Sequence, residues 1–191
     1  MKRIISILLV LIFALSMLPF IISCKRVDDE QAKEIVKDLV GKSYELNVIY
    51  FGAGLKHTIE EGNEDLYIRV DEDAAYQKKK PLVEMTRKVF SEKYAQSMIT
   101  TAFVGLSGGI EGSGAFARYI EDYDGILTIR KDSQIIDVEI ATYDFSTIKI
   151  VKNSKNQIIA RIMTNNLDVN QEVQIYLVYE KDSWKIDSAT Y

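Results

Sequence analysis

Apolar residues in the first half of the chain recur at helical spacing. Between Asp28 and Phe51 they fall mostly three or four positions apart, which predicts an amphipathic helix. Asp28 suits the amino-terminal cap of this helix, and Gly52 is expected to end it. Gly41 lies inside the pattern and marks a point where the helix could bend or break. The prediction is one long helix with a single apolar face.

Two shorter helices are predicted after a short strand at residues 66–70. Pro81 suits the first position of a helix, and Ser91 suits the cap of the next one. The first of these helices is expected to turn inward the residues Leu82, Val83, Met85, Thr86, Val89 and Phe90.

The pattern changes to strands in the second half of the chain. Asp124-Gly125 predicts a tight hairpin turn, because glycine accepts a positive φ. The predicted strands cover residues 117–123, 126–130, 135–141, 148–151, 158–163, 173–179 and 184–186. Helices followed by an antiparallel meander indicate an α+β fold, in which amino-terminal helices pack on a carboxyl-terminal sheet.

The chain opens with the features of an export signal. A basic start, Met1-Lys2-Arg3, precedes the uncharged residues 4–22, and small Ser23 comes next. Ile21-Ile22-Ser23-Cys24 resembles the lipobox of bacterial lipoproteins, in which the cysteine is acylated, for example with palmitate, and becomes the first residue. We therefore expect a signal peptide at 1–23, a tether at 24–30 and one domain at 31–191.

Two other interpretations of Cys24 stay open. The apolar run is long enough to remain as an uncleaved membrane anchor, and it also fits a plain secretory signal. In each case Lys2 and Arg3 hold the start of the chain inside. All three interpretations predict a folded part on the extracytoplasmic face of the cell membrane.

Charge narrows the range of partners. Loss of Lys2 and Arg3 with the signal leaves 168 residues, with 22 basic side chains against 28 acidic ones, a net charge of −6. That balance argues against nucleic acid, whose phosphates require a basic face. The acidic excess either keeps the domain soluble or favours a basic protein partner.

The reactive side chains are few. His57 is the only histidine and Cys24 the only cysteine, so neither a Cys–His pair nor a zinc site with several such ligands can form. We expect a protein that is not an enzyme and holds no cofactor or metal. A calcium or magnesium site built from carboxylates alone stays open. So does acid-only catalysis by Glu111, Asp122 and Asp124.

Residues 105–114 form a glycine-rich segment that suits no regular element. The segment matches a G-x-S-x-G nucleophile motif around Ser107, but the histidine lies before the serine and no helix is predicted after it. As a surface loop it would present Leu106 and Ile110 as apolar anchors and Glu111 as a charge. A loop without a binding role is the alternative. The other candidate partner-binding residues are Tyr50, Phe51, Asp122 and Asp124.

Short motifs over the mature chain resemble the IseA-like inhibitors of DL-endopeptidases. They are Ser43–Asn47, Ile49–Leu55, Leu82–Met98, Tyr123–Leu127 and Ser183–Ile186. The terminal meander is also similar to NTF2-like and cystatin-like domains. The first resemblance implies a non-enzymatic protein that blocks peptidoglycan-cleaving cysteine peptidases of the NlpC/P60 kind by occupying their cleft.

The leading hypothesis is thus a lipid-anchored extracytoplasmic protein that restrains a cell-wall hydrolase by contact. The alternative is an NTF2-like module that binds a small molecule or peptide. A deep apolar pocket between helices and sheet would favour the alternative, and a shallow acidic groove would favour inhibition.

Overall fold

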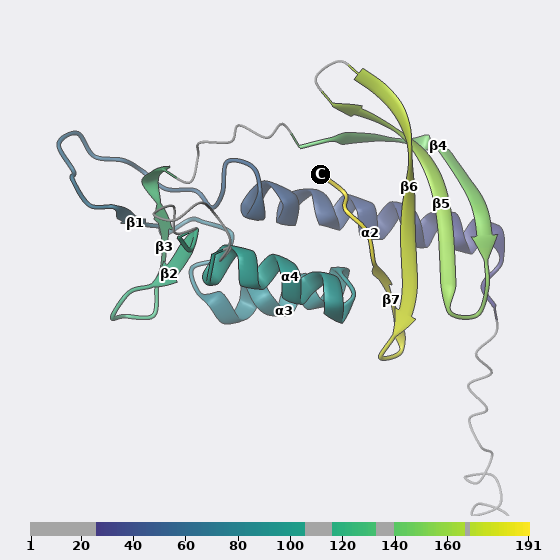
Figure 1. Cartoon of the computed structure of the whole chain (residues 1–191), viewed down its shortest axis with the longest axis horizontal. Helices are drawn as coiled ribbons and strands as arrows, with labels where there is room; N and C mark the ends of the chain where they lie inside the picture. Colours follow the sequence, from purple (N-terminus) through teal and green to yellow (C-terminus); the bar gives the residue numbers. More distant parts are fainter. Residues whose placement is uncertain (1–25, 106–115, 133–139, 167–168) are drawn as a thin grey trace, which may run out of the picture.

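The computed structural model describes residues 26–105, 116–132, 140–166 and 169–191. It is an α+β structure with helices packed against antiparallel sheet (Figure 1). The helices are α2 (Asp29–Tyr50), α3 (Lys79–Val89) and α4 (Glu92–Phe103). The strands are β1 (Tyr67–Arg69), β2 (Tyr119–Glu121), β3 (Leu127–Arg130), β4 (Thr142–Asn153), β5 (Gln157–Asn166), β6 (Val169–Glu180) and β7 (Ser183–Ile186).

Helix α2 begins and ends where its sequence predicts. The Asp28 side chain accepts a hydrogen bond from the Gln31 N–H at 2.8 Å, and the Gln31 side chain accepts one from the Asp28 N–H. The helix continues through Gly41 without a break. Residues 28–30, which we assigned to the tether, are the cap and first turn of α2. The part of the chain between Cys24 and this helix is correspondingly shorter than the predicted tether.

The second and third helices meet at Ser91. The Ser91 hydroxyl accepts a hydrogen bond from the Tyr94 N–H at 3.2 Å and caps α4, as predicted. Helix α3 begins at Lys79, two residues before the predicted start, so Pro81 lies in its first turn. Proline is tolerated there because the first-turn N–H groups have no partner within the helix.

Four strands form a large sheet in the order β4-β5-β6-β7, the predicted meander. All three pairings are antiparallel. Phe90, between α3 and α4, bridges Ile186 of β7, and the Ser91 N–H donates to the Ile186 carbonyl at 2.8 Å. The helical pair therefore covers the β7 edge of the large sheet.

The predicted hairpin joins a different sheet. Strands β2 and β3 pair across the Asp124-Gly125 turn, and β1 adds to the other edge of β3. The result is a separate small sheet with the order β1-β3-β2. The predicted strand at 135–141 lies largely outside the described residues, and β4 begins only at Thr142.

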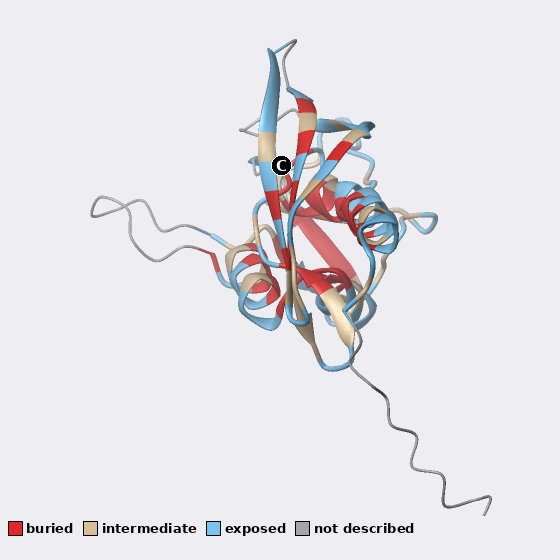
Figure 2. Cartoon of the chain, turned by 90° about the vertical axis from the view of Figure 1, so that its right-hand side faces the viewer, coloured by how far each residue is buried: buried red, intermediate tan, exposed pale blue. Residues whose placement is uncertain are grey.

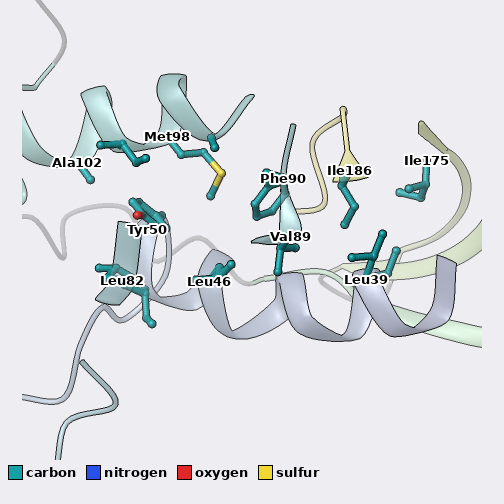
Figure 3. Packing of buried hydrophobic residues seen from close by; sticks show 14 of the residues in the cluster. Leu39, Leu46, Tyr50, Leu82, Val89, Phe90, Met98, Ala102, Ile175 and Ile186 are labelled. Atoms are coloured by element: carbon teal, nitrogen blue, oxygen red, sulfur yellow. The ribbon is translucent and has the colours of Figure 1, made fainter. Parts of the chain in front are cut away.

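The core follows α2 through the molecule. Figure 2 shows buried residues gathered along this helix, and Figure 3 shows side chains of α2 facing Val89, Phe90, Met98 and Ile186. Helix α2 contacts the large sheet through β4, β5 and β7 and also packs against α3. Burial of these side chains is the main stabilising term. Over the described residues, none of the helices combines the length and hydropathy needed to cross a membrane.

Candidate functional site

The small sheet has one face that packs inward. Ile68, Ile129 and Tyr119 lie side by side across its three strands, and all three are buried. The Tyr119 hydroxyl donates to the Ile49 carbonyl at 2.8 Å and accepts from the Leu55 N–H at 2.9 Å. These bonds attach the small sheet to the carboxyl-terminal end of α2.

The opposite face of the small sheet carries exposed apolar side chains and two arginines, Arg69, which is half-exposed, and Arg130, whose side chain is only 14% exposed. Arg69 and Ile120 both pair with Thr128 of β3, so they lie on this side. Tyr123 at the hairpin tip is 93% exposed, and Phe116 at the start of the hairpin is 63% exposed. We call the residues Arg69, Phe116, Ile120, Tyr123 and Arg130 the arginine–aromatic face.

The two arginines of this face lie close to its aromatic rings. The Arg130 guanidinium carbon lies 3.9 Å from the centroid of the Phe116 ring, within cation–π range. The corresponding distance from Arg69 to the Tyr123 ring is 6.0 Å, at the outer limit of that range. Arginine and aromatic side chains are therefore presented together.

Asp122 shapes the hairpin tip. One of its carboxylate oxygens accepts hydrogen bonds from the N–H groups of Asp124 and Ile126, both at 2.9 Å. Arg69 Nη2 lies 2.5 Å from Asp122 Oδ2 and 2.8 Å from Asp124 Oδ2. Partial burial alone would raise the pKa of Asp122, but these hydrogen bonds and Arg69 together lower it. Gly125 completes the turn with φ +71°.

Carboxylates offset the positive charge of the face. Arg130 pairs with Asp132 and lowers the pKa of that carboxyl. Arg69 bridges Asp122 and Asp124. Two guanidinium groups are thus matched by three carboxylates, so the apolar side chains lie in surroundings of nearly balanced charge.

The candidate residues on α2 do not join this face. The expectation that Tyr50 binds a partner needs correction, because this residue is only 4% exposed. Its hydroxyl shares a 2.8 Å hydrogen bond with Thr86 Oγ1 in the core. It lies on the apolar side of the helix, four positions after buried Leu46. Phe51 is half-buried and stacks on Tyr191 with ring centroids 4.0 Å apart.

Leu106, Ile110 and Glu111 lie outside the described residues. The described residues nearest to them are Gly105, which follows α4 and is buried, and Phe116 of the arginine–aromatic face. Asp122 and Asp124 are in this neighbourhood as supports of the hairpin turn.

The described residues contain no group of three or more His, Cys, Asp and Glu side chains arranged to hold a metal ion. His57 is half-buried, its Nδ1 lies 2.9 Å from the Leu55 carbonyl oxygen, and its backbone bridges Val70. The backbone of this histidine thus pairs with the residue that follows β1.

Three of the hollows on the described surface are large enough for a small ligand. One of about 410 Å³ lies beside the small sheet, between α3 and Glu121. One of about 460 Å³ lies between α2 and β7, next to Trp184. The third, of about 430 Å³, lies where β4, β5 and β6 meet, lined mostly by polar residues such as Asp144, Asn165 and Asn170. Each opens to solvent, and a buried residue forms part of the lining in two of them, Leu39 in the second and Thr164 in the third.

Sequence reasoning identified the hairpin but missed the side chains that the face exposes. Arg69 and Ile120 occupy the solvent side of strands that were correctly predicted. An apolar residue at an outward strand position was the available signal for Ile120. The sequence gives no comparable signal for Phe116 and Tyr123. Their exposure depends on where the hairpin lies relative to the rest of the fold. No protein-family model matches this chain, and no curated protein sequence matches it either.

Proposed function

We propose that this protein is a lipid-anchored, extracytoplasmic binding protein that restrains a peptidoglycan DL-endopeptidase without itself catalysing a reaction. The arginine–aromatic face is the contact surface, and it is the observation that carries the proposal. Acylation of Cys24 attaches the protein to the membrane. The short motifs that resemble IseA-like inhibitors, described above, suggest the class of partner.

The chemistry of the face supports a role in protein contact. Arginine and aromatic residues are enriched where protein interfaces gain most of their binding energy. Arg69 is already held by Asp122 and Asp124, so little side-chain freedom is lost when a partner binds. Tyr123 projects from a hairpin tip braced by the same residues, which suits insertion into a cleft.

Net charge supports a basic partner. The mature chain would carry −6, and such a field accelerates encounter with a positively charged enzyme. Because this effect is screened by ions, association should slow as salt increases, whereas dissociation should change little.

Inhibition of cell-wall cleavage tests the proposal. A panel of DL-endopeptidases would be assayed on peptidoglycan with the mature protein, and we expect inhibition at micromolar concentrations or below. Tyr123→Ala should weaken inhibition by about 30-fold or more, the effect of an interface hot spot. Tyr176→Ala on the large sheet is the matched control and should leave inhibition unchanged. Absence of inhibition across the panel would refute the proposal.

A second candidate is a module that binds a small molecule or peptide, with an open polar hollow in place of the deep apolar pocket expected of an NTF2-like module. The hollow of about 430 Å³ at β4, β5 and β6 falls in the size range of small-ligand sites, and its polar lining suits a sugar or a short peptide. Calorimetric titration with soluble peptidoglycan fragments tests this role. Binding that Asn165→Ala abolishes and Tyr123→Ala preserves would support the module over the inhibitor.

A further inference from the structure

The start of the described chain is fastened to one end of the large sheet. The Asn153 side chain at the end of β4 donates to the Val27 carbonyl at 2.9 Å and to Asp29 Oδ1 at 2.7 Å. Val27 packs against the core, and Asp28 caps α2 through the reciprocal bonds with Gln31. The chain therefore becomes rigid at Val27, three residues after Cys24.

Helix α2 separates this fastened end from the arginine–aromatic face. Its 22 residues correspond to a length of about 33 Å. Its first turn lies beside the turn between β4 and β5, and its other end meets the small sheet (Figure 1). Bonds at both ends, from Asn153 and from Tyr119, hold the helix in place as a spacer.

We propose that the β4–β5 turn rests on the outer surface of the membrane and that α2 holds the arginine–aromatic face about 30 Å further out. This inference rests on the proposed acylation of Cys24. Three residues reach at most about 10 Å, so a lipid on Cys24 leaves the fastened end close to the headgroups. The β4–β5 end of the molecule is thus expected to contact a lipid surface.

The tether sets this orientation and charge does not. Arg26, Lys152 and Lys155 are exposed at this end, but Asp28, Asp29 and Glu30 are exposed there as well. Attraction to anionic lipid requires a clear basic excess, which these residues do not provide. The orientation should therefore persist at high salt. A face held at this height would meet partners in the cell wall rather than in the membrane.

Amine footprinting on vesicles tests the orientation. The full chain, produced in a lipidating bacterium, would be reconstituted in phosphatidylcholine–phosphatidylglycerol vesicles and acetylated, with detergent micelles as the reference. Acetylation of Lys155, in the β4–β5 turn, should be several-fold slower on vesicles at both low and high salt. Lys80, 86% exposed at the small-sheet end, should react at the same rate in both. Equal protection of the two lysines, or greater protection of Lys80, would overturn the proposal.

A tether variant provides the matched control. About ten glycine and serine residues inserted between Lys25 and Arg26 would add roughly 18 Å of flexible reach, so protection of Lys155 should be lost. Persistence of protection in this variant would refute orientation by the tether. The mass of the peptide that contains Cys24 reports acylation separately. If that mass shows no lipid, coupling the Cys24 thiol to maleimide-bearing vesicles imposes the anchor, and the same footprint is expected.

Discussion

At the tip of the β2–β3 hairpin, one carboxylate determines how the candidate site is presented. Asp122 orders the turn through two backbone N–H groups and positions Arg69 beside Tyr123. Hydrogen bonds to an ionised acceptor are stronger than those between neutral groups. The Asp122 carboxylate uses such bonds both to order the turn and to hold Arg69. The aspartates that the sequence suggested as contact residues therefore act mainly by holding other contact residues.

Asp122→Asn should loosen the tip. Loss of the charge should leave Arg69 held by Asp124 alone and lower the melting temperature by a few degrees. Folding lowers the pKa of Asp122, so the contribution of its ionised form is complete above about pH 4 and is lost as pH falls through the lowered folded value. The variant should accordingly show a shallower loss of stability in acid, measured by thermal melts from pH 2 to 7. Identical acid slopes would contradict this role.

Tyr50 should titrate late. Burial is the main cause that raises its pKa to about 12, and the hydrogen bond with Thr86 offsets only part of this effect. A raised folded pKa means that the stabilising contribution is complete below about pH 10 and is lost as pH rises toward 12. Near-ultraviolet tyrosinate absorbance should show this residue ionising after the exposed tyrosines. Burial also raises the pKa of Tyr94, Tyr119 and Tyr143, so several tyrosines should ionise in this late step. Tyr50→Phe should reduce the amplitude of the step by one tyrosine, and an unchanged amplitude would contradict the raised pKa of Tyr50.

Single elements follow local signals closely. The caps at Asp28 and Ser91 and the turn at Gly125 lie where the sequence places them, because each depends on neighbouring residues alone. Ser91 also has a long-range role that its sequence context does not reveal. Its hydroxyl bonds the Asp187 carboxylate, so the cap joins α4 to the segment after β7.

Ser91→Ala should therefore destabilise the protein more than the loss of a helix cap that has no other partner. We expect the free energy of unfolding to fall by about 1–2 kcal/mol, since a buried hydroxyl that serves two partners is removed. Denaturant melts measure this change. Ser154→Ala, in the half-buried turn between β4 and β5, is the control and should have the smaller effect. Equal effects would show that the link to Asp187 contributes nothing.

On the scale of the whole molecule, α2 connects two sheets that do not share a strand. The large sheet packs along this helix, and the small sheet joins its end through Tyr119. The small sheet also contacts α4, and the Leu127 N–H donates to the Gln77 carbonyl at 2.8 Å. The position of the arginine–aromatic face thus depends on the end of α2 and on the helical pair beside it.

Tyr119→Phe should weaken that junction. The change leaves a buried carbonyl and a buried N–H without their partner, at a cost of about 2–4 kcal/mol. Hydrogen exchange should accelerate in β2 and β3 more than in β5 and β6. Tyr176→Phe, which removes an exposed hydroxyl bonded to Gln174, should change neither quantity. Uniform acceleration in both sheets would indicate a single cooperative unit instead.

The sequence by itself determined the α+β class, most elements and the hairpin turn, because periodicity, caps and turn residues act over a few neighbouring positions. Only the tertiary structure decided that the hairpin pairs with β1, that Tyr50 lies inward and that Phe116, Ile120 and Tyr123 share a face with two arginines. Those outcomes depend on contacts between segments far apart in the chain. Alternating side chains show that a strand has two faces, but the packing of the other elements selects the one that stays in water.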